Sequence, residues 1–269
     1  MIFIPPFAIK SRFLFKNRRN AYLCTMEDVQ WFESWFDTTY YHILYKNRDD
    51  QEAKRFVENL ISFLQLPQNS SVLDLACGKG RHSITLAAHG FNVLGVDLSE
   101  QSIAAAQQFE KGNLHFSTHD MREVIANKKF DAVFNLFTSF GYFDTEDDNL
   151  KMLQSIHQML HENGIVVIDF MNATKELANL IPFATKEIDT IAFQITKKAD
   201  NKHIYKYIEF EDKGKNHRYM ERVQALQLDD FKKLFDLVGF DLLHTFGNFD
   251  LEKFDAPTSN RLILIVQKR

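Results

Sequence analysis

The sequence is poor in cysteine, proline and glycine, with two, five and ten of these residues among 269. So few cysteines exclude a disulfide framework and are consistent with a reducing compartment, so we expect a cytoplasmic protein. The low glycine and proline content excludes collagen-like and low-complexity chains. No apolar run approaches the roughly 18 residues that a membrane-spanning helix needs, so no membrane partner is expected. Phenylalanine is abundant, with 26 residues, and 45% of the chain is apolar, which predicts a globular protein with a large core.

Positive charge is scarce outside the first 25 residues. Those residues carry five basic and no acidic side chains, which leaves 27 basic against 36 acidic side chains over the remainder. Because binding to nucleic acid depends on Lys and Arg contacts to phosphate, we expect no nucleic-acid partner. Within residues 1–25 the apolar part precedes the basic part, the reverse of a secretory signal. We therefore expect residues 1–25 to be a non-native or disordered extension, with an amphipathic membrane arm as the alternative.

Short apolar segments alternate with amphipathic helical segments between residues 51 and 172. The apolar segments are residues 72–76, 93–96, 114–116, 132–136 and 165–170. Helices are predicted over residues 51–64, after Gly80, from Ser99 as an N-cap, and from Thr145. Parallel strands need crossover connections, so this alternation predicts an α/β fold with a mostly parallel sheet covered on both faces. A helix that ends at Gly239 and two strands, about residues 240–247 and 261–267, close the chain.

The pattern changes after residue 172. Segments around residues 191–196, 203–210 and 218–223 mix apolar and polar residues without a helical period, and the turn-forming sequences ADNK and DKGKN separate them. We therefore predict a small antiparallel β insertion over residues 180–224. The remainder divides into a helical lid over residues 26–66 and a core over residues 67–179 and 225–269.

A glycine loop follows the first predicted strand. Gly78 and Gly80 let the backbone approach a ligand closely, and the helix start beyond them presents unpaired N–H groups. Asp97 ends the second strand, where a carboxylate can accept both hydroxyls of a ribose. Ligands of open α/β sheets bind at the carboxyl ends of the strands, so these residues predict a nucleotide-like site. The alternative is a tight turn without a ligand.

Four segments, in this order, resemble the motifs of class I S-adenosylmethionine-dependent methyltransferases. They are residues 72–80 (VLDLACGKG), 93–99 (VLGVDLS), 120–121 (DM) and 130–136 (FDAVFNL). The resemblance covers about residues 30–172 and extends to the closing helix and strands. It implies a Rossmann-like sheet of seven strands with the last antiparallel, S-adenosylmethionine as cofactor, and methyl transfer. Asn135 is followed by Leu-Phe-Thr, so the Asn/Asp-Pro-Pro-Tyr signature of enzymes that methylate nucleobase or glutamine amino groups is absent. Together with the acidic body, this absence predicts a small soluble acceptor. Position 83 is Ser, so the dinucleotide pattern G-x-G-x-x-G is incomplete.

The resemblance also implies roles around the cofactor. Asp74 would help to place the ammonium of its amino-acid part, indirectly or through water, and the backbone of Ala76, Gly78 and Gly80 would pass beside the methionyl part. Asp97 would bind the ribose hydroxyls, Leu98 would lie beside the adenine, Asp120 and Met121 would bind the adenine edge, and Leu136 and Phe137 would flank the sulfonium. In small-molecule members of the family a helical lid supplies a Tyr and an Arg, which here match Tyr41 (or Tyr45) and Arg48. An ion pair of Arg48 with Asp49 or Asp50 is the alternative.

The residues predict no catalytic nucleophile or base. Phe137, Phe140, Tyr142 and Phe143 are candidates to face the sulfonium, with core packing as the alternative. Arg81 and His82 open a helix, where a cation is disfavoured, so a contact with acceptor or cofactor is worth testing. His157 and His161 lack a third ligand, so no metal is expected.

Two other functions remain open from the sequence, an NAD(P)-binding Rossmann oxidoreductase and a catalytically silent cofactor-binding module. The insertion is expected to cap the acceptor site. The identity of the acceptor and the oligomeric state are not predicted.

Overall fold

A computed structural model describes residues 35–46, 50–143 and 145–269. Its larger sheet has seven strands in the order β10–β11–β5–β4–β1–β2–β3. These strands are β1 (Ser71–Leu75), β2 (Asn92–Asp97), β3 (Leu114–Thr118), β4 (Phe130–Asn135), β5 (Leu160–Met171), β10 (Phe240–Phe246) and β11 (Arg261–Lys268). The five strands β1 to β5 pair in parallel with their neighbours in the sheet. Strand β11 runs antiparallel to both β5 and β10. The predicted Rossmann-like sheet with an antiparallel last strand is confirmed.

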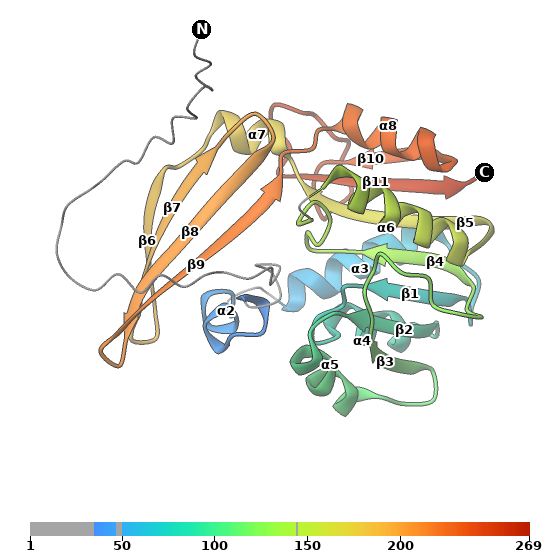
Figure 1. Cartoon of the computed structure of the whole chain (residues 1–269). Coiled ribbons are helices and arrows are strands. Elements are labelled where there is room, and N and C mark those ends of the chain that lie inside the picture. The colour runs from blue at the N-terminus through green and yellow to red at the C-terminus, as the bar shows by residue number, and fades with distance from the viewer. Residues whose placement is uncertain (1–34, 47–49, 144) are drawn as a thin grey trace, which may run out of the picture.

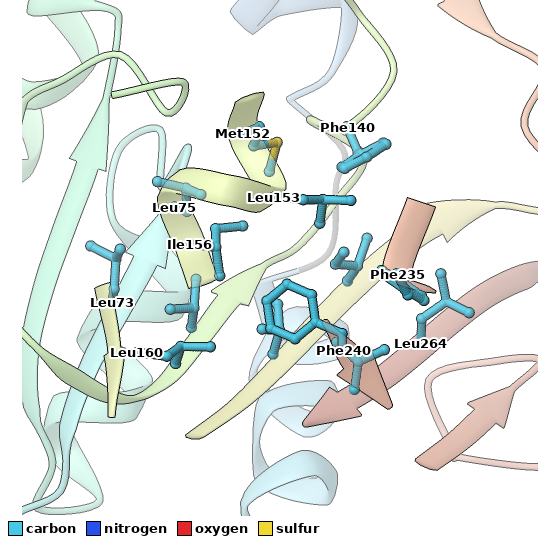
Figure 2. Packing of buried hydrophobic residues seen from close by; sticks show 14 of the residues in the cluster. Leu73, Leu75, Phe140, Met152, Leu153, Ile156, Leu160, Phe235, Phe240 and Leu264 are labelled. Carbon is cyan, nitrogen blue, oxygen red and sulfur yellow. The ribbon is translucent and has the colours of Figure 1, made fainter. Parts of the chain in front are cut away.

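Helices cover both faces of this sheet (Figure 1). They are α3 (Asp50–Leu64), α4 (Arg81–Ala88), α5 (Glu100–Ala106) with the 3-10 helix η1 (Gln107–Phe109), α6 (Glu146–Met159) and α8 (Leu228–Val238). The short helix α7 (Ala173–Ala178) follows β5 in the chain. Successive strand residues point to opposite faces, so Val72 packs with α3, α4 and α5 while Leu73 packs with α6 and α8. Figure 2 shows the second of these cores, where Leu153 and Ile156 of α6 meet Phe235 of α8.

Local sequence signals set several helix ends. The hydroxyl of Ser99 accepts a hydrogen bond from the N–H of Ser102 at the start of α5, and the hydroxyl of Thr145 accepts one from Asp148 at the start of α6. Gly239 ends α8 in the left-handed conformation. The helix boundaries predicted at these three residues are confirmed.

A second, four-stranded antiparallel sheet follows α7 in the chain and has the order β6–β7–β8–β9. Its strands are β6 (Phe183–Ile188), β7 (Ile191–Ala199), β8 (His203–Asp212) and β9 (Lys215–Gln224). Both predicted turns join neighbouring strands, but β6 was missed because its sequence FATKEI is mostly exposed and lacks apolar alternation. The division of the chain into lid, core and insertion stays a prediction.

Residues 35–46 cover one face of the four-stranded sheet. They include α2 (Thr39–Leu44), and Trp35 and Leu44 are buried against Phe193 and Phe210 of that sheet. Helix α3, which the sequence placed in the lid, instead packs on the large sheet with α4. The prediction for residues 1–25 lies outside the described residues. Within the described ranges, no helix has the length and apolar character needed to cross a membrane.

Candidate functional site

A cavity of about 630 Å³ lies at the carboxyl ends of β1, β2 and β4, where α2 faces the large sheet. In Figure 1 the arrows of β1 and β4 point toward α2. The volume falls within the roughly 300–1,000 Å³ typical of small-molecule sites. The predicted residues that line the cavity are Tyr41, Ala76, Gly78, Asp97, Leu98, Asp120, Met121, Leu136 and Phe137. Asp74 and Gly80 are absent from this lining, and Arg48 lies outside the described residues.

The two loop glycines serve different purposes. Both have positive φ, +55° at Gly78 and +83° at Gly80. A Cβ at Gly78 would have no neighbour within 4 Å among the described residues, so its backbone faces open space in the cavity. A Cβ at Gly80 would lie 2.6 Å from the ring of Phe116. Gly80 therefore lets the loop close onto β3, and Gly78 presents backbone to a ligand.

Asp74 lies behind the glycine loop. Its carboxylate is 1% exposed and accepts a hydrogen bond from the hydroxyl of Ser83 on α4. Burial raises the pKa of Asp74 to about 6, and the hydrogen bond from Ser83 opposes this rise. Any effect of Asp74 on a ligand therefore passes through the loop, as the indirect role predicted for it requires.

Asp97 is held by two backbone hydrogen bonds. Its Oδ2 accepts from the N–H of Gly78 at 2.8 Å, and its Oδ1 accepts from the N–H of Ser99 at 2.9 Å. Burial raises the pKa of Asp97, although both N–H groups favour the charged form. A carboxylate has about four acceptor positions, so Asp97, which lines the cavity, retains acceptor capacity beyond these two hydrogen bonds. This arrangement suits a vicinal diol such as that of a ribose.

Asp120 follows β3 and pairs with Arg122, which the sequence analysis did not identify. The Nη2 of Arg122 lies 2.6 Å from Oδ2 of Asp120, and its Nε lies 3.0 Å from Oδ1. Burial acts to raise the pKa of Asp120, but Arg122 outweighs it and holds that pKa below its ordinary value. Both residues and Met121 line the cavity. The basic residue two positions after Asp120 is the signal that could have revealed the pair.

The loop after β4 carries two left-handed residues, Phe137 (φ +69°) and Thr138 (φ +62°). Asp169 of β5, which is fully buried, accepts a hydrogen bond from the N–H of Phe137 at 3.0 Å. Arg261 of β11 donates to Asp169 at 2.7 Å and to the hydroxyl of Thr138 at 2.7 Å. The loop is therefore fixed from two other strands. A carboxylate inside the apolar run of β5 was a signal that the sequence analysis overlooked.

The aromatic candidates of this loop divide into two groups. Phe137, Tyr142 and Phe143 line the cavity, and Phe140 is fully buried in the core with Phe170 and Phe231. For Phe140 the packing alternative is therefore correct. The guanidinium of Arg81 lies 3.9 Å from the centre of the Phe137 ring and also lines the cavity. Arg81 at the start of α4 thus reaches the site, and the contact with acceptor or cofactor that its position suggested stays a prediction.

Another part of the cavity lining comes from residues 35–46 and the four-stranded sheet. Phe36, Tyr41 and Tyr45 belong to it together with Glu221 of β9. The hydroxyl of Tyr45 donates to Glu221 at 2.7 Å. Glu221 was missed because nothing in its local sequence distinguishes it from the other charged residues of the insertion.

Over the described ranges, no group of three His, Cys, Asp or Glu side chains is arranged to hold a metal ion. His157 instead packs its ring against Phe240, with the ring centres 5.3 Å apart.

Comparison with known proteins gives a consistent result. Residues 72–164 match a family model described as a methyltransferase domain. The Bacillus subtilis protein YqeM, named as a methyltransferase, is 37% identical over 123 residues, which are 45% of this chain and about half (49%) of that protein. A solved S-adenosylmethionine-dependent methyltransferase from Clostridium acetobutylicum shares the fold, with a TM-score of 0.72, 20% identity, and coverage of 85% of this chain and 96% of that one.

Residues 72–164 therefore form a methyltransferase domain, and the chain has the fold of solved S-adenosylmethionine-dependent methyltransferases. A longer match is the glycine/sarcosine N-methyltransferase of Aphanothece halophytica, 29% identical over 227 residues, which are 81% of this chain and 80% of that enzyme. The match to a methyltransferase domain favours the predicted function over the NAD(P)-dependent alternative. The open Gly78 backbone and the acceptor capacity of Asp97 fit S-adenosylmethionine as the cofactor.

Proposed function

We propose that this methyltransferase transfers the methyl group of S-adenosylmethionine to a nitrogen atom of a small molecule. The observation that carries the proposal is one cavity whose lining combines two unlike sets of residues. One set is Asp97 and the open backbone of Gly78, and the other is the rings of Phe36 and Tyr45 with the carboxylate of Glu221. The first set suits a nucleoside and the second suits an amine, because aromatic faces and carboxylates both attract positive charge.

The chain's own residues would hold the cofactor in the following way. Asp97 accepts the ribose hydroxyls, Leu98 lies beside the adenine, and Asp120 and Met121 bind the adenine edge. Ala76 and Gly78 run beside the methionyl part, Asp74 supports that loop from behind, Leu136 and Phe137 flank the sulfonium, and Tyr41 closes over it. Arg48 stays a prediction, and Gly80 acts on the shape of the loop. When bound, the cofactor supplies an electrophilic methyl group.

The small acceptor is the second part of the proposal. The Aphanothece relative is named for glycine and sarcosine, whose acceptor atom is an amine nitrogen. With 27 basic against 36 acidic side chains after residue 25, the chain is poorly suited to a phosphate backbone, so we propose no nucleic-acid partner. The low cysteine content supports a place in the cytoplasm.

Binding of the cofactor is tested by calorimetry with S-adenosylmethionine and S-adenosylhomocysteine. We expect both to bind and Asp97→Ala to weaken binding about tenfold or more, because two charge-assisted hydrogen bonds to the diol are lost. Asp229→Ala, which changes an exposed carboxylate on α8, is the matched control and should leave the affinity unchanged. Equal binding by Asp97→Ala and the parent chain would remove Asp97 from the site.

Turnover is tested with S-adenosylmethionine carrying a labelled methyl group. A panel of small primary and secondary amines, glycine, sarcosine and amino sugars is compared with the alcohols of the same skeleton. We expect label in amines and none in the alcohols. Cofactor binding without transfer to any member of the panel would support the silent cofactor-binding module instead.

A further inference from the structure

Glu221 has an unusual position relative to the cavity. In the part of the chain that the structure describes, it is the one residue of the four-stranded sheet that lines the cavity. Its side chain is 13% exposed, and it lies on the sheet face that packs against residues 35–46. The whole insertion therefore contributes to the cavity wall one chemical group, and that group is a carboxylate.

The hydrogen bonds of Glu221 leave acceptor capacity. Oε1 of Glu221 accepts from the indole N–H of Trp35 at 2.8 Å and from the hydroxyl of Tyr45 at 2.7 Å, and Oε2 lies 2.9 Å from the same hydroxyl and 3.3 Å from the ammonium of Lys206. Lys206 is the direct cross-strand partner of Glu221 in the pairing of β8 with β9. A carboxylate has about four acceptor positions, and the single hydroxyl proton of Tyr45 can fill only one of the two that it faces. One position therefore remains on a group that borders the cavity.

The charge of Glu221 is partnered on the sheet side by Lys206, and its contacts with Trp35 and Tyr45 do not require a charge. A neutral amide in its place could accept the hydrogen bonds from Trp35 and Tyr45, and keeping a carboxylate this far out of water is costly. Lys206 compensates part of that cost from the sheet side. The rings of Phe36, Tyr41 and Tyr142, whose faces attract cations, line the same cavity, and the ring centre of Tyr41 lies 4.9 Å from that of Tyr45, the partner of Glu221. A cationic group in the cavity would thus meet a carboxylate set among aromatic rings.

We propose that Glu221, with the rings of Tyr41 and Tyr142, forms the subsite that binds the amine end of the methyl acceptor. The amine donates an N–H hydrogen bond to the remaining acceptor position of the carboxylate. This inference rests on the proposed function and adds the residue that selects amines over neutral acceptors. The competing explanation is that Glu221 serves to fasten residues 35–46 to the sheet through Trp35 and Tyr45.

The test uses Glu221→Gln in the full chain, with the best amine from the labelled-methyl panel as the probe. The amide keeps the size of the side chain and an oxygen for Trp35 and Tyr45. We expect the kcat/KM for the amine to fall about tenfold to a hundredfold, mainly through KM, because a hydrogen bond to a charged group is lost. The affinity for S-adenosylhomocysteine should stay within about twofold of the parent value.

Two further variants separate the two explanations. Glu209→Gln removes an exposed carboxylate of the same sheet, paired with Arg218, and should change neither quantity. Tyr45→Phe loosens the attachment of residues 35–46 and keeps the charge of Glu221. If fastening is its role, Tyr45→Phe and Glu221→Gln will weaken cofactor binding and lower the melting temperature to similar extents, and that result overturns the inference.

Different experimental results would refute the inference and the proposed function. Efficient methylation of an amine by Glu221→Gln with an unchanged KM refutes the subsite and leaves the proposed function intact. Binding of cofactor without methylation of any amine refutes the amine acceptor, and the subsite with it.

Discussion

The carboxylate of Asp169 accepts the backbone N–H of Phe137 across 32 positions of sequence, at 3.0 Å. This hydrogen bond places a fully buried charge of β5 directly behind the aromatic residue that borders the cavity. Phe137 has a positive φ, which costs a residue with a Cβ roughly 1–2 kcal/mol. Asp169 and its partner Arg261 offset that cost, so the conformation of the loop depends on an ion pair between β5 and β11.

We expect Asp169→Ala to lower the free energy of unfolding by about 3 kcal/mol, because Arg261 loses its charge partner and the Phe137 N–H loses its acceptor. Denaturant unfolding measures the change. Asp241→Ala removes an exposed partner of Arg269 and should cost less than about 1 kcal/mol. Similar losses for the two variants would mean that the buried pair adds no more than a surface one.

We expect Gly80→Ala to destabilise the fold by about 2 kcal/mol or more. A Cβ at this position would lie 2.6 Å from the ring of Phe116, and φ is +83°. Thermal and denaturant unfolding report the loss. A variant with Phe116→Leu in the same chain should recover part of it, since a shorter side chain gives the Cβ room. Failure of the double variant to recover any stability would locate the cost in the backbone conformation.

Gly78→Ala should affect the ligand more than the fold. Its φ is +55° and a Cβ would have no neighbour within 4 Å among the described residues, so we expect a loss of about 1 kcal/mol in stability from backbone strain. Gly214→Ala, in the turn between β8 and β9, has φ of +72° and equally open surroundings, and should cost about the same. Calorimetry should then show weaker cofactor binding for Gly78→Ala alone. Equal affinities of the two variants would argue against the loop as the cofactor-binding backbone.

The pKa of Asp74, raised to about 6 by burial, makes stability depend on pH. The native state holds this proton more tightly than the unfolded state, whose Asp has its ordinary pKa near 4. The contribution to stability is therefore complete below about pH 4 and is lost as pH rises through about 6, by on the order of 3 kcal/mol. Unfolding free energies at pH 4 and pH 7 for the parent chain and Asp74→Asn measure the difference.

Asp74→Asn should show a smaller fall between those pH values. Ser83→Ala should show a larger fall, because the Ser83 hydrogen bond favours the charged carboxylate and its loss raises the pKa further. A parent chain and Asp74→Asn with the same pH dependence would contradict the assignment of this proton to Asp74.

The sequence by itself determined the sheet and the position of the cavity. Apolar segments of strand length, alternating with helical segments, allow little besides a parallel sheet, and ligand-binding residues of such a sheet meet where its strands end. Gly78, Asp97 and Asp120 could be predicted because each lies at the end of a strand or within three residues after it. Ser99, Thr145 and Gly239 marked helix ends through interactions with residues one turn away.

The tertiary structure decided which distant residues meet these. Arg261 reaches Thr138 across 123 positions, and Tyr45 reaches Glu221 across 176, and no local pattern carries such pairings. The same limit applies to Gly80 and Phe140. The local sequence around a turn glycine, or around an aromatic residue beside a site, does not show whether that residue faces a ligand or the core. Strand register and the packing of residues 35–46 on the four-stranded sheet choose between those outcomes, and both depend on the completed fold.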